Sequence, residues 1–313
     1  MPKRLLLAAL VAAMSWPLAA FAGGPTPAHV PAAAKAMFHV DCAALRDTTL
    51  YNTHRELKGD SNPFDTWLNL FNGVVGFHPL NDLDGVTIYT NNHGSDDAVA
   101  IWYGKTDQQR ILKNVRTWPQ YATQIHQGRT LHTWRDAKTN RTVAGAIVSD
   151  RVMVSASSIA GLKAALDVID ARTSGDSSIA AAFPKDAIAF AGLKDLPSAP
   201  RTVKSGAMAN LEALQMTLTE NDGKARFIIT AEAPTPELAL KSKQILDGLK
   251  ALMQLNNEKN PAAASLAMKI TNSADNKLVT SILEGDSREI LKDFVALERH
   301  RTATTRSTLP SVP

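Results

Sequence analysis

The sequence predicts an α+β protein made of two tandem related units, each an antiparallel sheet with helices packed on one face. In each unit two strand-like runs flank a glycine-containing turn, at 91–94 and at 221–223. A helix start follows each pair, and then a further strand and a helix. The span from Val86 to Val152 is 66 residues and the span from Leu214 to Leu278 is 64 residues. This near-equal spacing indicates an internal duplication.

Residues 1–22 have the pattern of a secretory signal peptide. Lys3 and Arg4 form a positive head, 5–16 is apolar, and 20–22 offers the small-x-small pattern that signal peptidase cleaves. The apolar run is shorter than the ~20 residues that a membrane span needs, so a retained anchor is the weaker alternative. We therefore expect a periplasmic or secreted protein with no membrane span after signal cleavage.

Net charge argues against nucleic acid as a partner. The chain carries a formal charge of +4, of which the signal peptide contributes two charges and the arginines of the C-terminal tail contribute three. The remaining body is close to neutral and has no clustered basic run. Cys42 is the only cysteine, so no internal disulfide forms. Burial is the favoured state for this thiol, and intermolecular pairing is the alternative.

The first unit is predicted over 34–175, after a proline-containing flexible lead-in at 23–33. Capping-box spacing of Thr106 and Gln109 predicts the start of a helix that buries Ile111. The other elements expected here are strands at 34–40, 86–89, 98–103, 130–134, 142–147 and 151–154, a helix at 64–75 within an insertion, and a closing helix that buries Leu162 and Leu166. Every tyrosine and every tryptophan after the signal peptide lies in this unit.

The second unit is predicted over 176–300, followed by a disordered tail at 301–313. Thr235 before Pro236 has the arrangement of an N-cap followed by proline in the first helical turn. The other elements expected are strands at 184–190, 214–218, 225–229 and 277–282, a short helix at 262–268 in place of the extra strands, and a closing helix that buries Ile290.

This layout resembles a group of secreted bacterial proteins that have a duplicated α+β unit and no assigned activity. Three runs carry the resemblance, at 76–89, at 121–134 and at 164–168. The first reads Gly-Phe-His-Pro-Leu-Asn-Asp-Leu-Asp-Gly-Val-Thr-Ile-Tyr. The resemblance covers most of the chain after the signal peptide, and it implies the architecture without implying any chemistry.

Three short motifs that could carry chemistry have better structural interpretations. Gly285-Asp286-Ser287 resembles the nucleophile motif of one esterase class, but Asp286 and Glu289 have the spacing of a helix N-cap. The run 82–85 has two acids and a glycine as in calcium loops, yet the twelfth position is a histidine, so a turn is favoured. His93 near two aspartates fits a solvated hairpin tip better than a metal site. We predict no catalytic set, no metal and no cofactor.

Four aromatic or imidazole side chains are the candidate ligand-binding residues: Trp118, Tyr121, His132 and Trp134. If the runs near Gln124 and Leu131 pair across Gln127-Gly128, His132 and Trp134 share one face of a hairpin, because strand residues two apart point the same way. Such a face can stack on glycans or peptides, although burial in a core is the commoner use of aromatic side chains.

The sequence therefore predicts an exported, non-enzymatic binding or scaffold protein whose partner is an envelope glycan or peptide, or another protein. The alternative is an exported hydrolase whose active residues meet only in three dimensions. A third hypothesis is an assembly role in which exposed sheet edges pair with partners.

Overall fold

The structure is a computed structural model, and it describes residues 25–58, 63–92, 97–136, 140–196 and 211–307. The predicted signal peptide and the middle of the first predicted hairpin turn lie outside these residues. Within the described part, no helix is both long and apolar enough to cross a membrane.

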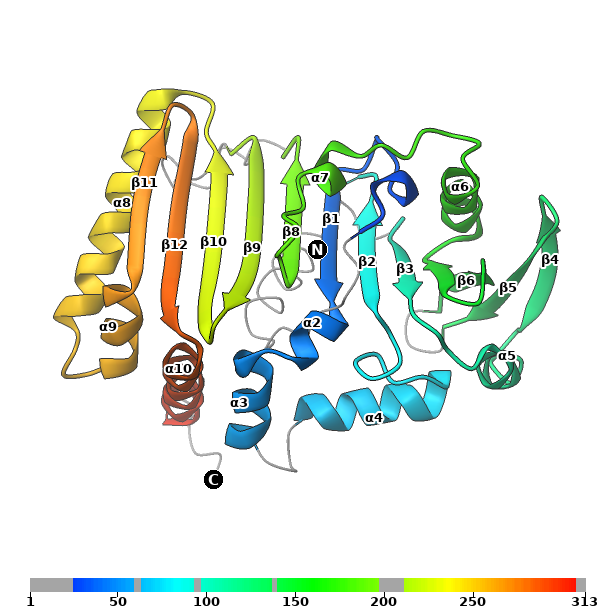
Figure 1. The fold of residues 1–313 in the computed structure, drawn as a ribbon, viewed down its shortest axis with the longest axis horizontal. Coiled ribbons are helices and arrows are strands. Elements are labelled where there is room, and N and C mark those ends of the chain that lie inside the picture. Colours follow the sequence, from blue (N-terminus) through cyan, green and yellow to red (C-terminus); the bar gives the residue numbers. More distant parts are fainter. Residues whose placement is uncertain (1–24, 59–62, 93–96, 137–139, 197–210, 308–313) are drawn as a thin grey trace.

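In the described residues, twelve strands form one continuous antiparallel sheet along the long axis of the molecule (Figure 1). Their order is β11-β12-β10-β9-β8-β1-β2-β3-β7-β6-β5-β4. In chain order the strands are β1 (Ala36–Asp41), β2 (Gly85–Thr90), β3 (Val99–Tyr103), β4 (Ala122–His126), β5 (Arg129–Arg135), β6 (Thr142–Ile147), β7 (Val152–Ala156), β8 (Ala189–Lys194), β9 (Ala213–Asn221), β10 (Lys224–Glu232), β11 (Ile270–Asp275) and β12 (Leu278–Asp286).

Helices lie along the lower edge of the sheet, at its β11 end and against its faces (Figure 1). They are the 3-10 turn η1 (Pro27–His29), α2 (Cys42–Arg46), α3 (Thr49–Lys58), α4 (Pro63–Val75), α5 (Gln108–Val115), α6 (Ile159–Ile169), α7 (Ser178–Ala181), α8 (Pro236–Leu255), α9 (Pro261–Met268) and α10 (Ser287–Ser307). The α+β class with an antiparallel sheet is thus confirmed. Most predicted elements are present, including the helix at 262–268 in place of the extra strands.

The strands do not form two separate sheets as expected, because β1 pairs with β8 across the middle of the chain. Met37 lies opposite Gly192 in this antiparallel pair. Outward from this seam, the strand order is β1-β2-β3-β7-β6 on one side and β8-β9-β10-β12-β11 on the other. On each side the first three strands follow chain order and the next two are in reverse chain order. Strands β5 and β4 extend the first side. An origin by duplication stays a prediction.

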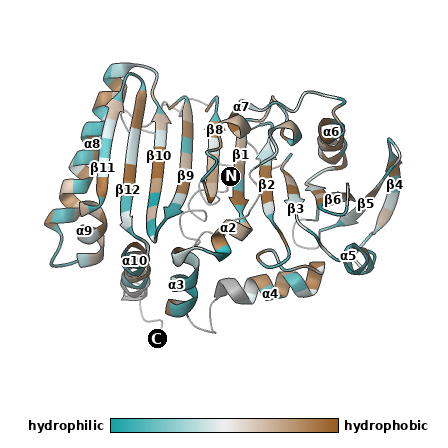
Figure 2. Cartoon of the chain, in the orientation of Figure 1, coloured by the Kyte–Doolittle hydropathy of each residue, from teal (hydrophilic) through white to brown (hydrophobic). Residues whose placement is uncertain are grey.

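Both faces of the first half carry helices, whereas the sequence indicated one. Met153 and Val154 are neighbours on β7, and their side chains point to opposite faces. Met153 lies in a core cluster with Ile111 of α5, while Val154 lies in a second cluster with Leu162 of α6. Figure 2 shows hydrophobic and hydrophilic residues alternating along many strands. The central strands β7 and β8 are instead buried on both sides, and a strand buried on both sides loses this alternation.

Local signals at helix and turn boundaries are mostly confirmed. The Thr235 hydroxyl accepts a hydrogen bond from the backbone N–H of Leu238 at 3.3 Å, as an N-cap does. Gly223 takes a positive φ of 71° in the β9–β10 turn. The predicted cap of α5 is wrong by one residue. Asp107, not Thr106, accepts from the N–H of Arg110, at 2.9 Å.

The two predicted flexible ends are more ordered than expected. In the lead-in, Val30 is fully buried in the core cluster of α6, and the His29 ring stacks on Tyr103 with centroids 6.0 Å apart. The proline content suggested a linker, but one well-placed apolar side chain fixes the segment. At the other end, α10 continues through Ser307, seven residues into the predicted tail. Extending an existing helix is cheap, because each added residue gains a backbone hydrogen bond.

Candidate functional site

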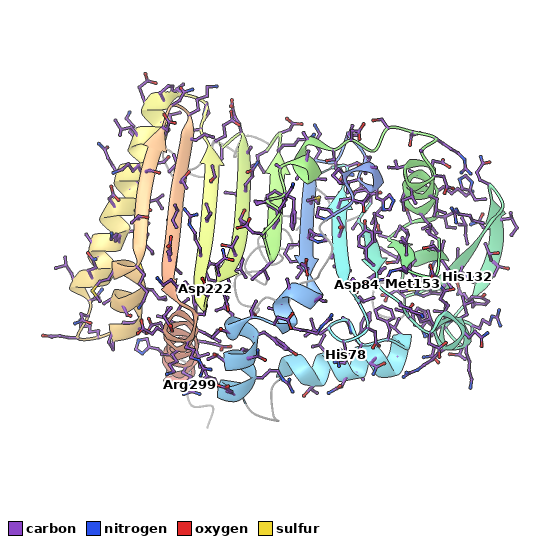
Figure 3. All side chains as sticks on the ribbon, in the orientation of Figure 1. His78, Asp84, His132, Met153, Asp222 and Arg299 are labelled. Atoms are coloured by element: carbon purple, nitrogen blue, oxygen red, sulfur yellow. The ribbon has the colours of Figure 1, made fainter. Side chains whose placement is uncertain are left out.

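The predicted β4–β5 hairpin forms and places the candidate residues at one end of the sheet. Ala122 lies opposite Thr133 and His126 lies opposite Arg129. The turn residues Gln127 and Gly128 both have positive φ, at 51° and 78°. This is the conformation of a tight two-residue hairpin turn, which glycine favours. Figure 3 marks His132 at this end of the sheet.

Tyr121 and His132 form a hydrogen-bonded stack. The Tyr121 Oη and His132 Nδ1 atoms are 2.8 Å apart, and the two rings lie nearly parallel at 20° with centroids 6.0 Å apart. The His132 side chain is buried, with 9% of the residue exposed. Burial lowers the pKa of His132 below its ordinary value, and the positive charge of Arg116 lowers it further. Both effects favour the neutral form of the imidazole.

Trp118 and Trp134 form a second pair beside the first. Their rings meet edge to face, with centroids 4.8 Å apart and an angle of 69° between planes. The Trp134 ring also covers Gly145 on β6. A Cβ at that glycine would lie only 3.3 Å from Trp134 Cη2. The absence of a side chain at Gly145 therefore lets the indole ring approach the β6 backbone closely.

A short connecting segment between α5 and β4 supplies Trp118 and Tyr121. Its backbone is fixed to the hairpin, because the Arg135 N–H donates to the Pro119 carbonyl at 2.8 Å. Within the segment, the Tyr121 N–H donates to the Trp118 carbonyl at 3.3 Å, and Gln120 has a positive φ of 54°. All four predicted residues thus come together. Trp118, Tyr121 and Trp134 are partly buried against the core, so the cluster is a packed wall with exposed edges.

Sequence reasoning missed the most exposed apolar side chain at this end. Ile125 on β4 is 68% exposed. Thr123 pairs directly with His132, so it points to the same face, and Ile125 lies two residues further along that face. Among the described strands, β4 is the last of the sheet and pairs only with β5. The sequence does not predict that Ile125 lies on an edge strand, because the position of a strand in the sheet depends on pairing between distant segments of the chain.

His126 does not join the cluster, although it is close in sequence. Its Nε2 atom lies 3.1 Å from a carboxylate oxygen of Asp167 on α6, on the opposite face of the sheet. Arg129 also reaches α6, where its Nε donates to Asp170 at 3.0 Å. These contacts attach the turn end of the hairpin to α6. They hold the hairpin in place from behind, while Trp118 and Tyr121 pack on its front.

Carboxylates that could serve chemistry elsewhere are engaged at helix starts. Asp286 accepts from the N–H of Glu289 at 3.0 Å, so it caps α10 as predicted. Glu220 accepts from the N–H groups of Thr49 and Leu50, at 2.6 and 3.0 Å, and so satisfies the start of α3. The Cys42 thiol is buried and lies 3.0 Å from the Pro79 carbonyl, and burial raises its pKa. These groups hold the fold together.

Two shallow polar hollows adjoin the β9–β10 turn, on the other half of the sheet. Figure 3 marks Asp222 there. The hollows measure about 430 and 300 Å³ and share Asp186, Asn221 and Asp222. Among the described residues, no group of three or more histidine, cysteine or acidic side chains is arranged to hold a metal ion. The aromatic cluster therefore stays the candidate site that the sequence singled out.

Comparison with known proteins gives only remote likeness. No family model matches the chain, and no curated protein matches it. Among solved structures, TP0453 in crystal form I is 8% identical, with a TM-score of 0.41 over 88% of this chain and 98% of that chain. TP0453 in crystal form IV is 7% identical, with a TM-score of 0.43 over 87% and 96% of the two chains. At these scores the likeness carries no functional property to this chain.

Proposed function

We propose that this protein is an exported, non-enzymatic module that binds an extended peptide segment of an envelope or protein partner at the β4 end of its sheet. The observation that carries the proposal is the exposed Ile125 on a terminal strand, beside the wall formed by Tyr121, His132 and Trp134. An added strand gains main-chain hydrogen bonds along a sheet edge, and side chains on the adjacent face select its sequence.

The sequence of β4 supports this use of the edge. In proteins that stay monomeric, the terminal strands of a sheet usually carry lysine, proline or a bulge, which block pairing with another chain. The strand reads Ala-Thr-Gln-Ile-His and contains neither lysine nor proline. Its face combines an apolar contact at Ile125 with the hydroxyl of Thr123. A partner strand would thus meet an apolar side chain and aromatic edges together.

The alternative of a hydrolase has less support from the polar groups. Asp286 caps a helix, Glu220 satisfies the start of another, and His126 contacts Asp167. A general base must be placed within reach of a nucleophile, and these groups are held by structural partners. We therefore propose binding in preference to catalysis. A glycan is the second candidate ligand, after a peptide.

The test is capture of envelope components by immobilised mature protein, with partners identified by mass spectrometry. Ile125→Lys places a charge on the edge strand, and we expect it to remove the specific partner. Leu70→Lys is the matched control, because Leu70 on α4 is 65% exposed and lies away from β4. Loss of the partner with both variants, or with neither, contradicts binding at β4. Hydrolysis of a generic ester by the wild type, lost in a variant of the polar hollows, would favour the enzyme.

A further inference from the structure

Positive charge is concentrated at the β4 end of the sheet. Residues 105–136, which contain α5, β4 and β5, include six lysines and arginines and two aspartates, a net charge of +4. The rest of the chain carries no net charge in total. No contiguous basic run marks this segment in the sequence, because its charges are spread over three elements. The fold brings these elements together at one end of the molecule (Figure 1).

Helix α5 presents its basic side chains on the side opposite its buried one. Arg110, Lys113 and the C-terminal cap Arg116 are spaced three residues apart, so they lie along one side of the helix. Ile111 and Val115 are buried on the other side and pack into the core. All three basic residues are exposed. The helix therefore directs these charges away from the core.

Two of these charges are not neutralised by the fold. Within the described residues, Lys113 and Arg116 take part in no ion pair. Arg129 on β5, by contrast, donates from Nε to Asp170 at 3.0 Å. Asp107 is the acidic residue next to α5, and its carboxylate caps the start of that helix. Lys113 and Arg116 are thus the charges available to another molecule.

Arg116 lies beside the aromatic cluster, at the start of β4. The end of α5 leads directly into the cluster, where the Tyr121 N–H donates to the Trp118 carbonyl at 3.3 Å. The Arg116 charge is near enough to His132 to lower the pKa of the imidazole. His132 and Ile125 mark one face of the hairpin, which is also the face toward α5. A strand added to β4 would therefore pass Ile125 and then approach the basic side of α5.

We infer that the peptide bound at the β4 edge is acidic, with a carboxylate side chain two or four residues away from an apolar one. This inference rests on the proposed function. Alternate residues of a strand point to the same face, so both side chains of the peptide would face α5. The apolar side chain would pack on Ile125, and the carboxylate would meet Arg116 and Lys113. Charge-assisted hydrogen bonds from a guanidinium to a carboxylate would fix the register of the added strand.

The edge strand favours a peptide over other acidic molecules. An edge strand presents main-chain N–H and C=O groups that a further strand can pair with, and neither a lipid headgroup nor a uronic acid chain supplies a matching row of amides. A second copy of this chain is disfavoured at β4, because two ends of like charge would be brought together. Opposite charge on the partner would also raise its rate of association.

Selection from a displayed library of random peptides of about ten residues, longer than a typical strand of about 5–6 residues, tests the chemistry of the ligand. The mature chain is immobilised and the peptides are selected at low salt. We expect enrichment of aspartate or glutamate two or four positions from an apolar residue. Ile125→Asn removes the apolar contact without a change of charge, and it should abolish binding of the selected peptides.

A charge cycle tests the contact with α5. Neutralising the acidic residues of a selected peptide to their amides should weaken its binding to wild type by about fivefold, as two exposed charge contacts would. The double variant Lys113→Gln/Arg116→Gln should bind both forms of the peptide equally. Lys241→Gln/Lys292→Gln is the matched control, since these exposed lysines lie on α8 and α10, and it should behave as wild type. Between about 0.05 and 0.5 M salt, only the acidic peptide should lose affinity.

The outcomes separate this inference from the proposed function. Selected peptides that depend on Ile125 but are uncharged or basic, or that bind the Lys113→Gln/Arg116→Gln variant as they bind wild type, overturn the inference and leave binding at β4 intact. A library that yields no peptide dependent on Ile125 contradicts binding at β4 itself. Without such a peptide, binding of polygalacturonate or of phosphatidylglycerol vesicles to wild type, lost in the same double variant, would assign the basic side of α5 to a glycan or a lipid and overturn the inference.

Discussion

Replacing Tyr121 by phenylalanine isolates one hydrogen bond in the aromatic cluster. The change deletes the hydroxyl, which lies 2.8 Å from His132 Nδ1, and keeps the ring that stacks on the imidazole. A typical hydrogen bond contributes about 1 kcal/mol, and a buried group left without its partner costs about 1–3 kcal/mol. Because His132 is only 9% exposed, we expect a loss of about 2 kcal/mol in the free energy of unfolding.

Urea unfolding of the mature chain at pH 7.5 measures this loss. His132→Gln and the double variant complete a double-mutant cycle, in which the coupling energy between the two side chains should be of the order of 1 kcal/mol. If Tyr121→Phe changes stability by less than the about 0.5 kcal/mol typical of surface substitutions, the cluster is not a packed wall. In that case the rings are open to solvent, and Trp118 and Trp134 gain weight as contact residues.

The same pair gives a pH dependence with a definite sign. Burial holds the pKa of His132 in the folded chain below its ordinary value of 6.5. As the pH falls through 6.5, the unfolded chain takes up the proton first, so the folded state loses stability relative to it. The loss ends once the pH is below the folded pKa. Between pH 7.5 and 5, stability should therefore fall less steeply in His132→Gln than in wild type, and equal slopes would contradict the burial of the imidazole.

Three further variants or measurements test the packing and the caps. Leu162→Ala removes a fully buried side chain of α6 and should cost about 3 kcal/mol by thermal or urea unfolding. Asp286→Ala removes the cap that binds the Glu289 N–H and should cost about 1 kcal/mol, with no change in any ester hydrolysis. The Cys42 thiol is buried beside Pro79, so it should react with a disulfide reagent only at the rate of unfolding.

The sequence predicted those parts of the fold that depend on neighbours along the chain. The β4–β5 hairpin follows from Gln127-Gly128, the start of α8 follows from Thr235 before proline, and the cap of α10 follows from Asp286. Each of these signals depends on residues within four positions of one another, so it can be recognised without knowledge of distant contacts. The one-residue error at Asp107 has the same origin, because two adjacent side chains there can both accept a helical N–H.

Contacts between distant segments could not be predicted in this way. The pairing of Met37 with Gly192 joins segments more than 150 residues apart. This β1–β8 pairing merges the two expected sheets into one. Val30 lies in a proline-containing segment that the sequence predicts to be flexible, yet its side chain is buried in the core cluster around α6. Helices on both faces were missed for a related reason, since Met153 and Val154 are both apolar and a doubly buried strand loses its alternation.

The candidate site was half predictable. Period-two spacing on one strand placed His132 and Trp134 on a common face. Trp118 and Tyr121 join them because the segment before β4 folds back on the hairpin, held by the Pro119 carbonyl. Exposure was out of reach: nothing in the sequence distinguishes the exposed Ile125 from a buried core isoleucine.

The seam between β1 and β8 bears on the meaning of the two predicted units. Separated at the predicted boundary of 175 and 176, each half would leave one of these strands as an open edge with buried side chains on it. Phe190 of β8 belongs to the same core cluster as Met37 of β1, and Leu218 belongs to the same cluster as Val40. Each half thus supplies the cover for the central strand of the other. Similar strand order on the two sides is therefore compatible with one cooperative fold.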